Sequence, residues 1–136
     1  MSDISALSHE YEASAKFAEE LNEAILAIKK ARLHRQPGLT TDQRRSLANT
    51  VEALRQQVQA DQDLGRTEFI PQGMVDRVKE RNRPHMAYFL DDLSRTVCVL
   101  EGGSEPLDDA VVQVLDVICD AADETASAVF RRLHGR

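Results

Sequence analysis

A short basic stretch is one place in the sequence where side chains could bind a charged ligand. Four cations lie within seven residues: Arg77, Lys79, Arg81 and Arg83. Pro84 follows directly, at a point where a helix must break or kink. Such a cluster could hold the phosphate groups of a nucleic acid or a nucleotide. The alternative is that the cations pair with Asp and Glu on neighbouring helices, so phosphate binding through residues 77–85 is one hypothesis among several.

A group of carboxylates lies in the run Glu19-Glu20-Leu21-Asn22-Glu23. The run is similar to the first acidic motif of the all-α nucleotide pyrophosphohydrolases, and that resemblance implies a Mg²⁺-dependent enzyme acting on a triphosphate. The family has a second acidic pair, three residues apart, in the next core helix. Here that spacing recurs about a hundred residues later, so the resemblance implies a site made of Glu19, Glu20, Glu23, Asp120 and Asp123. The alternative is that these acids face water or pair along their own helices.

The run Leu7-Ser8-His9-Glu10 resembles the phosphoacceptor box of sensor histidine kinases. In that family the histidine lies on a bundle helix and the following acid assists phosphoryl transfer, so the resemblance implies a phosphotransfer bundle. The proline that the family carries a few positions later is absent, and 136 residues leave no room for an ATP-binding domain. A solvent-facing histidine near the start of a helix is the alternative.

The charge of the chain favours a basic partner over a nucleic acid or a membrane. The net charge is −6, which argues against a general affinity for nucleic acids or acidic membranes. Residues 84–128 hold ten carboxylates and one Arg. A concentrated negative surface suits a basic protein partner, and a solvated surface that keeps a small bundle soluble is the plain alternative.

The two cysteines and the chain start predict a reduced, cytoplasmic protein. Cys98 and Cys119 lie in apolar helical stretches, where we expect them to pack as core residues. The first residues show no secretory signal, and no apolar run reaches the eighteen residues of a membrane span. The sequence has no pattern of a Ser-His-Asp triad, no zinc-ligand spacing, no calcium loop and no glycine-rich phosphate loop. We therefore expect no cofactor and no metal, and we lean against an enzyme.

A long helix over residues 3–35 organises the chain. Its apolar seam alternates steps of three and four residues: Ile4, Leu7, Tyr11, Ser14, Ala18, Leu21, Ile25 and Ile28. At about 1.5 Å per residue, this helix is close to 50 Å long. A compact protein of this size has a radius of gyration of roughly 14 Å, so the bundle must be elongated.

Three further helical segments follow, over residues 41–64, 71–101 and 105–133. Thr40 and Gln43 form a capping box at the start of the first of these. Pro84 either kinks the segment over 71–101 or divides it, with Asn82 available as a cap. We therefore predict an all-α, elongated up-down antiparallel bundle of four principal helices in one domain spanning residues 1–136.

The function predicted from these patterns is protein–protein contact without catalysis. An acidic cytoplasmic bundle of this kind could be an adaptor, a regulator or a neutraliser of a basic partner, and we expect a homodimer. Pairing the first helix with the second through the turn at Pro37 leaves the start of the longer helix uncovered. The predicted interface residues are therefore Ile4, Leu7 and Tyr11. The pyrophosphohydrolase and the phosphate-binding hypotheses remain as alternatives.

Overall fold

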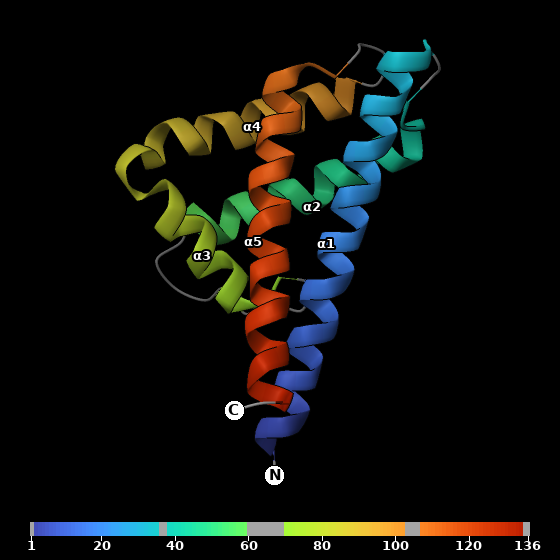
Figure 1. Cartoon of the computed structure of the whole chain (residues 1–136). Coiled ribbons are helices and arrows are strands. Elements are labelled where there is room, and N and C mark those ends of the chain that lie inside the picture. Colours follow the sequence, from blue (N-terminus) through green and yellow to red (C-terminus); the bar gives the residue numbers. More distant parts are fainter. Residues whose placement is uncertain (1, 36–37, 60–69, 103–106, 135–136) are drawn as a thin grey trace.

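The computed structural model describes residues 2–35, 38–59, 70–102 and 107–134. All regular structure in these residues is helical, as Figure 1 shows. The elements are α1 (Ser2–His34), α2 (Thr41–Gln59), α3 (Gln72–Asn82), the 3-10 turn η1 (Arg83–His85), α4 (Met86–Gly102) and α5 (Asp109–His134). The predicted all-α antiparallel bundle is confirmed, and its third segment consists of α3 and α4. The predicted end of the second helix, near residue 64, lies outside the described residues.

The longest helices, α1 and α5, form an antiparallel pair that runs the length of the molecule (Figure 1). α2 packs chiefly against α4, while α3 contacts α5 and α2. The expected pairing of the first helix with the second through the turn at Pro37 is therefore wrong, because α1 packs chiefly against α5. A 33-residue helix buries more of its stripe along the 26 residues of α5 than along the 19 residues of α2.

The contact between α1 and α5 joins large apolar side chains of α1 to small side chains of α5. α1 buries a stripe that includes Leu21, Ile25 and Ile28. On α5, Ala121 and Ala122 have no exposed surface, and such small side chains let two helices approach closely. Each buried Leu or Ile contributes about 2 kcal/mol of hydrophobic free energy, so burial of this stripe stabilises the pair.

The helix ends follow local side-chain chemistry. The predicted capping box is confirmed: the Thr40 N–H donates to Gln43 Oε1 at 2.8 Å, and the Gln43 N–H donates to Thr40 Oγ1 at 3.1 Å. α1 ends where Arg35 adopts a left-handed backbone with φ of 53°. The predicted start of the last helix at residue 105 is wrong, because Asp108 precedes the helix and caps it. Its Oδ1 accepts the Val111 N–H at 3.0 Å.

Pro84 divides the third segment into two helices. It lies in η1, and α4 leaves this turn in a different direction from α3 (Figure 1). The suggestion that Asn82 caps the second piece is wrong. Its side-chain amide donates back to the Val78 carbonyl of α3 at 2.8 Å, so it closes the end of the first piece.

A buried arginine fastens α2 to α4. Arg44 is only 6% exposed. Its Nε donates to the Leu100 carbonyl at 3.0 Å and its Nη2 to the Val99 carbonyl at 2.6 Å. These carbonyls lie in the last turn of α4, where a helix has no partners of its own to offer them. The guanidinium therefore caps α4 from the neighbouring helix.

Candidate functional site

A groove of about 730 Å³ lies between α1 and α5, and we call it the α1–α5 groove. The residues that α1 contributes are Tyr11, Ala15, Ala18, Glu19 and Asn22. The residues that α5 contributes are Cys119, Asp120, Asp123, Ala126, Ser127, Phe130 and Arg131. The groove follows from helix periodicity, because these positions lie beside the buried stripe of each helix, on the side that the other three helices do not cover.

Small side chains keep the groove open. Ala15 and Ala18 line it from α1, Ala126 and Ser127 line it from α5, and none of these side chains extends beyond a methyl or hydroxymethyl group. Larger residues at these positions would fill the hollow between the two helices. A third helix or an extended chain can therefore approach the α1–α5 pair closely along this line.

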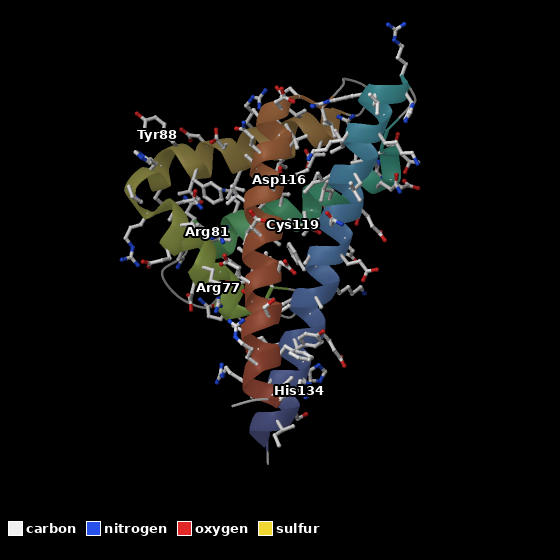
Figure 2. The ribbon with its side chains drawn as sticks, in the orientation of Figure 1. Arg77, Arg81, Tyr88, Asp116, Cys119 and His134 are labelled. Carbon is white, nitrogen blue, oxygen red and sulfur yellow. The ribbon has the colours of Figure 1, made fainter. Side chains whose placement is uncertain are left out.

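Carboxylates make the groove negative. Glu19 lines it from α1, and Asp120 and Asp123 line it from α5. Burial raises the pKa of the Cys119 thiol, and the charges of Asp120, Asp123 and Asp116 raise it further. The thiol donates to the Ala18 carbonyl at 3.5 Å (Figure 2 labels Cys119 and Asp116). A thiol with a raised pKa is a poor nucleophile, so Cys119 is not a candidate reactive centre.

One end of the groove is aromatic. The rings of Tyr11 and Phe130 lie 5.7 Å apart at 49°, and the rings of Phe130 and His134 lie 4.3 Å apart at 44°. Figure 2 shows His134 at this end of α5. Arg131 contributes a positive charge here. This end offers flat apolar surface, while the carboxylates occupy the rest of the groove.

Most of the exposed large apolar side chains described belong to the same two helices. In the part of the chain that the structure describes, the large apolar residues with the most exposed surface include Ile4 at 64%, Leu26 at 56% and Leu33 at 77% on α1, and Phe130 at 46% on α5. Tyr88 on α4 is the fifth. Contiguous exposed apolar surface is a mark of a binding surface, whereas isolated residues are not.

The three predicted interface residues lie at the first turns of α1. Ile4 is exposed, and Leu7 and Tyr11 are half-buried. Phe130 of α5 packs against Tyr11 and covers part of it, whereas Ile4 keeps 64% of its surface exposed. Of the three, Tyr11 lines the α1–α5 groove.

The five carboxylates of the pyrophosphohydrolase resemblance are divided between two grooves. Glu19, Asp120 and Asp123 line the α1–α5 groove, whereas Glu20 and Glu23 line a separate groove between α1 and α2. Within the described residues, no group of three or more His, Cys, Asp or Glu side chains has the geometry to hold a metal ion. Sequence spacing suggested one acidic site, but adjacent residues on a helix point about 100° apart.

The basic stretch is used within the fold. Arg81 pairs with Glu124 of α5 and lies 4.0 Å from Asp120, and Arg83 pairs with Glu80 at 2.6 Å. Arg77 donates to the Gly73 carbonyl at 3.2 Å and to Thr125 Oγ1 at 3.5 Å. Figure 2 shows Arg77 and Arg81 on α3 beside α5. Lys79, the fourth cation of the stretch, is half-buried on α3 and also interacts with other groups.

The remaining candidate residues lie apart from the groove, except for one cysteine. His9 is exposed near the start of α1. The expectation that both thiols are core residues is wrong for Cys98, which is exposed on α4, whereas Cys119 is half-buried, packs against the core and also lines the groove. Both lie in apolar stretches, but helix periodicity turns these two positions away from the buried stripes of α4 and α5.

Comparisons with protein-family models, with curated proteins and with solved structures find no match to this chain. Along the residues that the structure describes, none of the helices combines the length and the apolar character that a membrane crossing requires. The argument about function therefore starts from the α1–α5 groove and its exposed apolar surroundings.

Proposed function

We propose that this protein acts without catalysis, through contact with another protein on the face formed by α1 and α5. The observation that carries the proposal is the coincidence on these two helices of the 730 Å³ groove and four exposed large apolar residues: Ile4, Leu26, Leu33 and Phe130. Such surface is stabilised when a partner covers it. An adaptor, a regulator or a neutraliser of a basic partner would all use a face of this kind.

A pair of serines allows a direct test. Ser127 lines the α1–α5 groove, and Ser94 is exposed on α4. A photo-crosslinking amino acid is placed at one or the other position, and the full chain is irradiated in its native host. We expect a discrete covalent adduct from position 127 and none from position 94. Equal labelling from both positions, or no adduct from position 127, overturns the proposal.

Self-association is the second candidate, and one observation favours it. Ile4, Leu26 and Leu33 share one side of α1, so a second copy could cover them. The homodimer predicted through Ile4, Leu7 and Tyr11 would use the same helix. Static light scattering at micromolar concentration tests it: a mass of 15.2 kDa means a monomer, and twice that mass means a dimer.

A further inference from the structure

We infer that the α1–α5 groove binds an amphipathic, cationic helix of a partner protein, with an apolar stripe in the groove and Lys or Arg beside the stripe. The inference rests on the proposed function and names the chemistry of its partner. Three properties of the groove lead to it: its length and floor, the placement of its charges, and the cost of placing a second copy there.

The shape of the groove suits a helix. It extends along α1 from Tyr11 to Asn22, which at about 1.5 Å per residue is roughly 17 Å, or three helical turns. Its floor of alanines and a serine permits the axis separation of roughly 8 to 10 Å at which helices pack. A bound helix would lie on the α1–α5 pair as a third rod, with its apolar stripe toward Ala15 and Ala126.

The charges of the groove select the partner. Carboxylates line it from both helices, with Glu19 on one side and Asp120 and Asp123 on the other. A helix with Lys or Arg on either side of its apolar stripe meets carboxylates of both helices at once. Among the lining residues the opposing charge is Arg131, at the aromatic end beyond the carboxylates, and outside the groove Arg81 of α3 lies 4.0 Å from Asp120. The three carboxylates therefore match a partner that is cationic along its length and apolar at its end.

A second copy of this chain fits the groove less well. A two-fold interface places the same patch on both sides, so the carboxylates of one groove would face those of the other. Both copies also carry a net charge of −6. Juxtaposed like charges are unfavourable, and they disfavour the groove as a self-association surface. The same carboxylates repel the phosphate groups of nucleic acids and lipids.

The test uses three synthetic peptides of about eighteen residues, each labelled with fluorescein. The first has Leu and Ala at i, i+3, i+4 and i+7 and Lys at the flanking positions. The second replaces every Lys by Glu, and the third keeps the composition of the first but scrambles the stripe. Fluorescence anisotropy measures their binding to the full chain. We expect the first peptide to bind at least tenfold more tightly than the other two, with an affinity that falls as salt rises.

Protein variants locate the binding. Ser127→Tyr fills the groove, and the double variant Asp120→Asn/Asp123→Asn removes two of its charges. Asp91→Asn/Asp92→Asn removes two exposed charges from α4 and is the matched control. We expect both groove variants to lower the affinity for the first peptide at least tenfold, and we expect the control to change that affinity less than twofold. Circular dichroism and thermal unfolding confirm that each variant is folded.

The outcomes separate the inference from the proposed function. Equal weakening by the groove and control variants would show attraction to net charge alone, and it overturns the inference. So does equal binding of the Lys and Glu peptides, or binding that survives Ser127→Tyr. If no peptide binds, the inference is wrong, while the proposed function still stands or falls by the crosslink at position 127.

Discussion

The two antiparallel pairs of the bundle are held together in different ways. α2 and α4 are joined by a buried polar group, since the Arg44 guanidinium donates to two carbonyls of α4. α1 and α5 are joined by an apolar stripe and small residues, and ion pairing appears at one end, where Arg32 meets Asp109 at 2.5 Å. Within the described residues, the α2–α4 pair has one exposed large apolar side chain, Tyr88, whereas the α1–α5 pair has four.

Under the proposed function, the α2–α4 pair supports the fold and the α1–α5 pair binds the partner. The α2–α4 pair uses its buried polar group within the fold and presents mostly polar surface outward. The α1–α5 pair uses one side of each helix for the core and leaves the adjacent side hollow and partly apolar. We therefore expect substitutions on the inner side of α1 to change stability and those on its outer side to change binding only.

The largest expected effect contrasts two leucines of α1. Leu21 is buried and Leu26 is exposed, five residues further along the same helix. We expect Leu21→Ala to lower the free energy of unfolding by about 3 kcal/mol, because it removes apolar contacts and leaves a cavity. Leu26→Ala should change it by less than about 0.5 kcal/mol. Urea unfolding followed by circular dichroism measures both. Equal losses would mean that the outer side of α1 is also part of the core.

The next effect tests the polar anchor of the α2–α4 pair. We expect Arg44→Ala to lower the free energy of unfolding by about 2 kcal/mol, since it leaves the carbonyls of Val99 and Leu100 without these donors inside the fold. Arg45→Ala is the matched control, because Arg45 is exposed, and it should cost less than about 0.5 kcal/mol. Urea unfolding again provides the measurement. A small loss for Arg44→Ala would mean that apolar packing alone holds α2 to α4.

Sequence periodicity was enough to predict the helices but not their pairing. The capping box at Thr40 and the division at Pro84 are local, so they follow from a few neighbouring residues. Which helix packs against α1 depends on the total surface that each possible partner buries. That total cannot be read from a few neighbouring residues in the sequence. The short connection after residue 35 therefore suggested α2, whereas the longer stripe of α5 is the main partner.

The candidate site was only partly visible in the sequence. Glu19, Asp120 and Asp123 were selected for their spacing, and they do line one groove. Glu20 was selected with them because it is adjacent in sequence, but it lines another groove. Arg44 and the aromatic pair of Tyr11 and Phe130 were missed as contacts, because each joins residues far apart in the chain. Only the three-dimensional pairing of helices brings them together.

A smaller effect concerns Asp108, which links α4 to α5. Its Oδ2 accepts from Arg95 at 2.5 Å, and its Oδ1 caps the first turn of α5. We expect Asp108→Ala to lower the free energy of unfolding by about 1 kcal/mol at pH 7. Asp108→Asn should cost less, because an amide oxygen can still accept the Val111 N–H.

The environment of Asp108 also predicts that the free energy of unfolding depends on pH. The hydrogen bond from Arg95 lowers the pKa of Asp108, and the Val111 N–H lowers it further. Because the folded state binds this proton less readily than the unfolded state, the contribution is complete above about pH 5 and is lost as the pH falls through 4 and below. Unfolding curves should therefore show the gap between the natural chain and Asp108→Asn closing in acid. A gap that stays constant down to pH 3 would show that the charge of Asp108 contributes nothing.

The smallest expected effect is a gain in stability from a substitution between α1 and α5. Ser14 has no exposed surface, and its hydroxyl oxygen has no hydrogen-bond partner among the described residues. Removing an unsatisfied buried hydroxyl relieves a desolvation cost, and Ala is also the better helix former. We expect Ser14→Ala to raise the free energy of unfolding by roughly 0.5 to 1 kcal/mol. Ser8→Ala, at a half-buried position six residues earlier, is the control for helix propensity alone. If both variants gain equally, the buried hydroxyl costs nothing, and the α1–α5 pair tolerates a polar group inside its seam as readily as the α2–α4 pair does.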